Sequence, residues 1–144
     1  MDYLKSVVIL LVEDDPGDQK LTKKSLLEAK IVDNVVIAEN GEHALEYLER
    51  SKNGDRNCPT PNLILLDLNM PGMGGKEFLK RVKADENFSM IPVVVLTTSD
   101  LENDIRESYK LHASGYIKKP VTMDGFQEMM RNLQEYWFGV CKSV

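Results

Sequence analysis

Four short apolar runs, rich in Val, Ile and Leu and free of polar alternation, constrain the fold more than any other feature of the sequence. They lie at 7–12, 35–38, 63–66 and 93–96. Strands that are buried on both faces have this composition, whereas strands with one solvated face alternate apolar and polar residues. The runs therefore indicate a sheet that is covered on both sides.

Stretches with helical spacing separate these runs. Apolar residues recur three or four positions apart at 44–48, 78–82, 101–109 and 126–137, and a weak fifth strand is expected at 116–118. Alternation of strand and helix five times predicts parallel strands joined by right-handed crossovers. We therefore expect an α/β fold with three layers, in which helices cover both faces of a doubly wound, five-stranded parallel sheet.

Length and composition exclude several classes of protein. The chain has 144 residues, of which 42% are hydrophobic and 28% charged, and about 100 to 150 residues suit a single globular domain. The net charge of −5 argues against a nucleic-acid surface. The longest apolar run is too short to span a bilayer, and no signal peptide begins the chain. We expect one cytoplasmic domain over 1–144, with no nucleic-acid or membrane partner.

Polar residues follow four of the five expected strands, at the point where each strand ends. They are Glu13, Asp14 and Asp15 after the first strand, Asp67 and Asn69 after the third, Thr97 and Thr98 after the fourth, and Lys118 and Lys119 after the fifth. In open parallel sheets, ligands bind at the carboxyl ends of the strands. These residues are therefore expected to form one site.

Clustered carboxylates repel one another unless a cation neutralises them. Mg²⁺, with Mn²⁺ as an alternative, accepts one or two carboxylates together with water and phosphate oxygens. Asp14 and Asp67 are expected to bind the metal directly, and Glu13 through water. A carboxylate beside such a metal can attack phosphorus and form an acyl phosphate. Thr97 and Lys119 suit the phosphoryl oxygens as a hydroxyl donor and a positive charge.

Each of these residues also has a purely structural explanation. Asp15 followed by Pro16 suits the N-cap and first turn of a helix equally well. Glu13 and Asp14 could be solvated acids at a strand end, and Asp67 could be a turn residue. The segment 51–62 contains Gly and Pro and is expected to be an enlarged surface loop.

Four sequence motifs in order support a family resemblance. They are LLVEDD at 10–15, LLDLNMPGMGG at 65–75, VVVLTTSD at 93–100 and GYIKKP at 115–120. Over about 7–133 the chain resembles the receiver domains of two-component response regulators. The resemblance implies the flavodoxin-like strand order 2-1-3-4-5, with a core at about 6–134 and an aromatic C-terminal extension at 135–144.

The resemblance also implies a role for each site residue. Asp67 matches the phosphoacceptor, Glu13 and Asp14 the acidic pair, Asn69 a backbone-carbonyl ligand of the metal, Thr97 the switch hydroxyl, Lys119 the phosphate-contacting lysine and Tyr116 the switch aromatic residue. The commonest receiver pattern has aspartate where this chain has Glu13. The expected function is to accept a phosphoryl group from a sensor histidine kinase and to signal through a conformational switch in a phosphorelay.

Within the family, the chain is similar to stand-alone regulators of bacterial phytochrome-type histidine kinases. The similarity is carried by the loop at 51–62, the segment 109–121 and the aromatic residues at 135–138. Three consecutive aromatic residues, Tyr136, Trp137 and Phe138, cannot all face one core. A homodimer through the fourth helix, fifth strand, fifth helix and C-terminal tail is therefore expected. The alternative is that the tail folds back over the first helix and the sheet edge of its own chain.

Two rival functions are weaker. A phosphohydrolase of the haloacid-dehalogenase type needs a general acid two positions after its nucleophile, and Asn69 cannot serve as one. A receiver with a dead site is disfavoured because every residue that the chemistry needs is present. The chain is thus expected to be a phosphoacceptor with self-catalysed phosphotransfer and autodephosphorylation, and no other enzymatic activity.

Overall fold

A computed structural model describes residues 7–28, 32–68, 70, 73–97, 106, 110, 113–118, 124–125, 128–129 and 131–132. Of residues 32, 33, 97, 116 and 118 it describes the backbone alone. The elements are β1 (Val7–Val12), α1 (Pro16–Glu28), β2 (Val32–Ala38), α2 (Gly41–Lys52), β3 (Leu63–Asp67), α3 (Gly75–Ala84), β4 (Val93–Thr97) and β5 (Gly115–Lys118).

The strands form one sheet in the order β2-β1-β3-β4-β5, and all four neighbouring pairs are parallel. The predicted order is confirmed. The second apolar run marked only the end of β2, which begins three positions earlier, at Val32. Because β2 lies at the edge of the sheet, the exposed Asn34 can be part of it.

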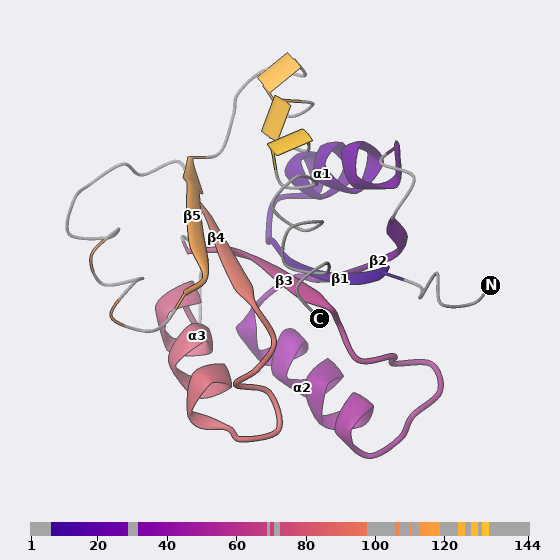
Figure 1. The fold of residues 1–144 in the computed structure, drawn as a ribbon, viewed down its shortest axis with the longest axis vertical. Coiled ribbons are helices and arrows are strands. Elements are labelled where there is room, and N and C mark those ends of the chain that lie inside the picture. Colours follow the sequence, from indigo (N-terminus) through magenta and orange to yellow (C-terminus); the bar gives the residue numbers. More distant parts are fainter. Residues whose placement is uncertain are drawn as a thin grey trace.

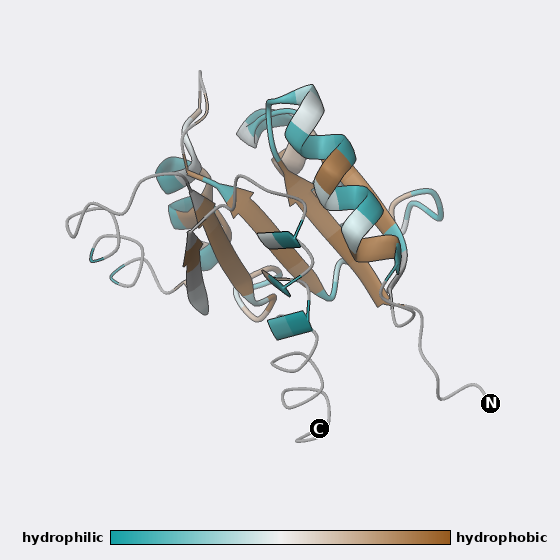
Figure 2. Cartoon of the chain, turned by 90° about the horizontal axis from the view of Figure 1, so that it is seen from above, coloured by the Kyte–Doolittle hydropathy of each residue, from teal (hydrophilic) through white to brown (hydrophobic). Residues whose placement is uncertain are grey.

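Two hydrophobic clusters lie on opposite faces of the sheet. On one face, Ala44 and Leu48 of α2 pack with Phe78 and Leu79 of α3, while on the other Leu26 of α1 packs against the strands. Figure 1 shows α1 on one side of the sheet and both α2 and α3 on the other, and Figure 2 shows hydrophobic strands between mixed helices. Every residue of β3 is buried. The structure therefore has the predicted three layers.

Side chains cap the first two helices. The backbone N–H of Asp18 donates to Asp15 Oδ2 at 2.8 Å, and Pro16 is the first residue of α1. The backbone N–H of His43 likewise donates to Asn40 Oδ1 at 2.8 Å. Such caps satisfy N–H groups that have no partner within the helix. The structural explanation of the Asp15–Pro16 pair is confirmed.

The segment predicted as a loop from position 51 begins later, because α2 continues to Lys52. The loop is closed by hydrogen bonds. Tyr47 Oη donates to the carbonyl of Pro59, and the hydroxyls of Ser51 and Thr60 lie 2.9 Å apart. Burial, with a smaller contribution from nearby Cys58, raises the pKa of Tyr47 to about 12.

The two remaining predicted helices fall largely outside the described residues. Arg106 and Lys110 are helical, as are residues 124, 125, 128, 129, 131 and 132. Met129 is buried and packs with the cluster around α1, as expected for the stripe at 126–137. None of the helices in the described part of the chain combines the length and apolarity needed to cross a membrane.

An acidic cluster at the carboxyl ends of β1 and β3

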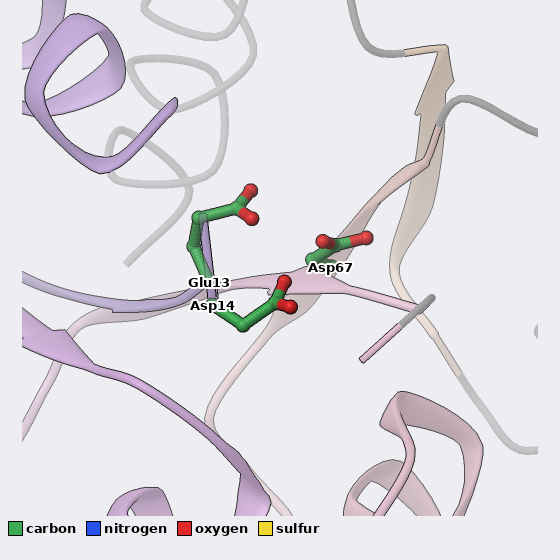
Figure 3. Close-up of side chains that lie close together, drawn as sticks. All are labelled: Glu13, Asp14 and Asp67. Atoms are coloured by element: carbon green, nitrogen blue, oxygen red, sulfur yellow. The ribbon is translucent and has the colours of Figure 1, made fainter. Parts of the chain in front are cut away.

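The acidic cluster consists of Glu13, Asp14 and Asp67, which come from two neighbouring strands. Asp67 is the last residue of β3, and Glu13 and Asp14 directly follow β1. These strands run side by side in register, with Val12 opposite Leu66. The three carboxylates therefore meet at the same edge of the sheet, as their positions at the strand ends predicted (Figure 3).

One carboxylate oxygen from each of these three residues lies within 4.8 Å of the other two. Glu13 is 1% exposed and Asp67 is 5% exposed, and Asp14 is more exposed than either. At such separations each pair of charges repels by roughly 3 kcal/mol for an effective dielectric constant near 20. The cluster thus concentrates negative charge that a bound cation would neutralise.

Three hydrogen bonds connect Glu13 to β2, to Asp15 and to α1. Its backbone N–H donates to the carbonyl of Ala38 at 3.0 Å, at the end of β2. Its carboxylate Oε2 accepts from the backbone N–H of Asp15 at 3.1 Å, and its carbonyl accepts from Gln19 Nε2 at 2.7 Å. The end of β1 is therefore fixed to β2 and to the first turn of α1.

The backbone beyond Asp67 is fixed by β4 and α3. The N–H of Leu68 donates to the carbonyl of Leu96 at 3.2 Å, and the carbonyl of Leu68 accepts from the N–H of Gly75 at 3.2 Å. Asp67 itself is opposite Leu96 in the β3–β4 ladder. The strand end that carries Asp67 is thus held from two sides.

The donor set fits a divalent metal ion. Three carboxylates supply only oxygen ligands, which hard cations such as Mg²⁺ and Mn²⁺ prefer, and direct binding by one or two of them would leave positions for water and phosphate. A soft thiolate or an imidazole is absent from the cluster. Glu13, Asp14 and Asp67 would therefore hold such an ion.

Two further predicted residues are placed through their backbones only. Thr97 ends β4, the strand beside β3, and pairs with Lys118 of β5, while Tyr116 lies within β5. Their side chains, and all of Asn69 and Lys119, lie outside the described residues.

Two supporting residues, Gln19 and Gly75, were not predicted from the sequence. Gln19 lies one turn into α1 and has no local pattern that would point to Glu13. Gly75 is the first residue of α3 and directly follows Gly74, and consecutive glycines at the start of a helix are a signal of close packing.

Comparison with known proteins places this geometry in a family. Residues 9–131 match the response regulator receiver domain. Response regulator Rcp1 of Synechocystis sp. is 38% identical over 130 residues, which cover 90% of this chain and 88% of Rcp1.

Solved structures agree. The phosphorylated cyanobacterial phytochrome response regulator RcpA matches with a TM-score of 0.84 and 37% identity, over 94% of this chain and 96% of that one. The Mn²⁺-bound form of Rcp1 matches with a TM-score of 0.79 and 38% identity, over 91% and 94%. With a parallel sheet of the same order and an acidic cluster at its carboxyl edge, this chain belongs to the response regulator receiver family of two-component signalling.

Proposed function

We propose that Asp67 is the phosphoacceptor of this receiver and takes its phosphoryl group from a sensor histidine kinase. The observation that carries this proposal is the position of Asp67, a buried carboxylate at the end of the central strand with two further carboxylates within 4.8 Å. Receivers signal through phosphorylation as a family, and histidine kinases are their partners.

In the proposed step, a carboxylate oxygen of Asp67 attacks the phosphorus of a phosphohistidine. The new P–O bond forms as the P–N bond breaks, and the histidine nitrogen keeps the electron pair and takes up a proton. Lys119 and Thr97 are proposed to bind the phosphoryl oxygens, which would offset part of their charge. Later attack by water would release phosphate, so that the chain catalyses only its own modification.

Receiver domains bind a divalent metal at this acidic cluster. For this chain we propose Mg²⁺, with Mn²⁺ as a substitute, held directly by Asp14, Asp67 and the backbone carbonyl of Asn69. A bound cation would neutralise charge on the carboxylates and on the phosphoryl oxygens. Glu13 is proposed to act through a water molecule bound to the metal, because direct ligation by one or two carboxylates is usual for Mg²⁺.

Signalling is proposed to run through Thr97 and Tyr116. The added phosphoryl group carries close to ~2 negative charges, and the Thr97 hydroxyl would move to donate to it. Thr97 ends β4, and Tyr116 pairs with Val95 of the same strand, so a shift at one residue can reach the other through β4. Phosphorylation would thereby shift a two-state equilibrium.

Three finer proposals concern partners and context. The similarity to RcpA, a phytochrome response regulator, supports a phytochrome-type kinase as the donor. The relatives Rcp1 and RcpA match over 88% and 96% of their own lengths, which supports one receiver domain at 1–144. We propose that this domain is cytoplasmic. The consecutive aromatic residues at 136–138 support a homodimer through the fourth predicted helix, β5, the fifth predicted helix and the C-terminal tail.

Incubation with acetyl phosphate and Mg²⁺, followed by intact-mass measurement, tests the central proposal. One phosphoryl group per chain is expected, and Asp67→Asn should remove it because an amide is no nucleophile at neutral pH. Asp124→Asn, which changes an exposed aspartate in the C-terminal helical segment, should label fully. Full labelling of Asp67→Asn would refute the assignment.

A further inference from the structure

Two glycines stand at the starts of α2 and α3, and both are buried. Gly41 is the first residue of α2 and Gly75 the first of α3. Alanine is favoured over glycine in helices, so helix propensity does not explain them. Among the described glycines, only Gly54 has a positive φ, so backbone conformation does not explain them either. Lack of space for a side chain remains as the reason.

Gly75 lies against the peptide that follows the proposed phosphoacceptor. A Cβ atom at position 75 would lie 2.6 Å from the carbonyl oxygen of Asp67 and 2.6 Å from the Cα atom of Leu68. Both are backbone atoms, and the hydrogen bonds of Leu68 to Leu96 and to Gly75 hold that peptide in place. A methyl group at position 75 can therefore be accommodated only if the end of β3 or the start of α3 moves.

Gly41, at the start of α2, lies against Met73 in the segment between β3 and α3. Its lack of space for a side chain is less severe than that of Gly75. A Cβ atom there would lie 2.9 Å from Met73 Sδ and 3.2 Å from the Met73 carbonyl oxygen. The methionine side chain can rotate away, whereas the carbonyl allows only a small shift. At Gly74, by contrast, a Cβ atom would have no neighbour within 4 Å, and the backbone is extended, a conformation that alanine adopts readily.

We propose that Gly75 is a positioning residue for Asp67. Because it has no side chain, the start of α3 packs directly on the peptide between Asp67 and Leu68, and this contact fixes the Asp67 carboxylate relative to those of Glu13 and Asp14. Gly41, at the start of α2 on the same face of the sheet, gives weaker support through Met73. This inference depends on the proposed function of Asp67 only when phosphorylation is measured, and not when Mn²⁺ affinity is measured.

The test compares Gly75→Ala, Gly41→Ala and Gly74→Ala in the full chain. Each is titrated with Mn²⁺ alone, with free Mn²⁺ followed by electron paramagnetic resonance, and melted in the presence of a chelator. Gly75→Ala should weaken Mn²⁺ binding roughly tenfold or more, as loss of supporting contacts does at other metal sites. Gly41→Ala should weaken it less, and Met73→Ala in that background should restore it. Gly74→Ala should bind as the parent does.

Metal affinity separates positioning from stability, because a purely structural role would lower the melting temperature and leave the folded site unchanged. The inference is overturned if folded Gly75→Ala binds Mn²⁺ like the parent, or if Gly74→Ala loses as much. If Gly75→Ala does not fold, the test rests on Gly41→Ala and on the double variant Gly41→Ala, Met73→Ala. The inference is then overturned if Gly41→Ala binds Mn²⁺ as tightly as the parent does. A parent that binds Mn²⁺ but takes no phosphoryl group from acetyl phosphate would refute the proposed function alone.

Discussion

At the carboxyl ends of β1 and β3, three carboxylates lie within 4.8 Å of one another. At the amino ends of the same strands, Val8 and Asn62 exchange two hydrogen bonds of 2.8 Å, one through the Asn62 side chain and one between backbones. The first arrangement brings like charges together, whereas the second pairs each donor with an acceptor. The same two strands thus carry a destabilising cluster at one end and a stabilising one at the other.

The turn between α3 and β4, near the amino ends of the strands, is also stabilised by side-chain contacts. Lys83 Nζ donates to the carbonyls of Ser89 and Ile91 at 3.0 and 2.7 Å, which closes the turn between α3 and β4. Lys52 Nζ lies 5.9 Å from the ring centre of Phe88, linking that turn to α2. Functional sites commonly reduce stability in return for activity, and here the three clustered carboxylates lie at the carboxyl edge of the sheet.

Mg²⁺ should have the largest effect on stability, because it would bind the carboxylates at the carboxyl edge and offset their repulsion. At about a hundred times its dissociation constant, a ligand that binds only the folded state adds about 2.7 kcal/mol to the free energy of unfolding. Asp14→Asn should remove most of that gain, yet unfold less readily than the parent in a chelator, because one repulsive charge is gone. Denaturant titrations with and without Mg²⁺ measure both quantities. A metal-free Asp14→Asn that is less stable than the parent would contradict the repulsion argument.

Asn62→Ala should show the opposite pattern. The backbone N–H of Val8 would lose its acceptor in a partly buried position, which costs about 1–3 kcal/mol. Urea denaturation should detect this loss, whereas Mn²⁺ affinity should not change. Asn57→Ala, in the exposed part of the same loop, is the control and should behave as the parent. Weakened metal binding in Asn62→Ala would show that the two ends of the strands are coupled.

Lys83→Met should destabilise the amino edge to a smaller extent. It keeps an apolar stem but removes the donor to both carbonyls. Burial lowers the pKa of Lys83, so desolvation of the ammonium offsets part of the gain, and we expect a loss of about 1–2 kcal/mol. Lys80→Met changes an exposed lysine of the same helix and serves as the comparison. Equal stability of the two variants would mean that the turn does not depend on Lys83.

The last expected effect is confined to alkaline pH and comes from the pKa of Tyr47. Its pKa in the folded chain is about 12, against 10.0 for the ordinary phenol. Between these values the folded state binds more protons than the unfolded state, so stability falls as the pH rises through this window. The difference in stability between the parent and Tyr47→Phe should therefore be constant below pH 10 and decline from about 10 to about 12. Absorbance of the phenolate and denaturation at each pH provide the check, and a constant difference up to pH 12 would contradict it.

The sequence predicted the sheet well where strands are buried on both faces. β1, β3 and β4 were marked by unbroken apolar runs, while β2 lost its first half because Asn34 is exposed at the edge. The end of α2 was missed because the turn residues after Lys52 obscured its last two positions. The predicted bounds were therefore wrong where a strand is exposed at the edge of the sheet, and where the last residues of a helix are of types that are also common in loops.

The acidic cluster was predictable for a topological reason. Parallel strands bring their carboxyl ends together, so Glu13, Asp14 and Asp67 could be grouped without coordinates. The contact of Gly75 with the peptide after Asp67, and the hydrogen bond of Gln19 to Glu13, could not be predicted in this way. Both depend on how closely particular helices approach the strand ends, for which a sequence pattern provides no distance.

The reciprocal pair of Val8 and Asn62 joins positions that are 54 residues apart in the chain. β1 and β3 can pair only after the intervening β2 and α2 have been looped out or folded, and such non-local pairing slows folding. Because the carboxylates belong to these two strands, a chain in which they have not yet paired has no complete metal site. The rate of metal binding during refolding would therefore report the rate at which β3 pairs with β1. The same step would show when a newly made chain has a site that can be phosphorylated.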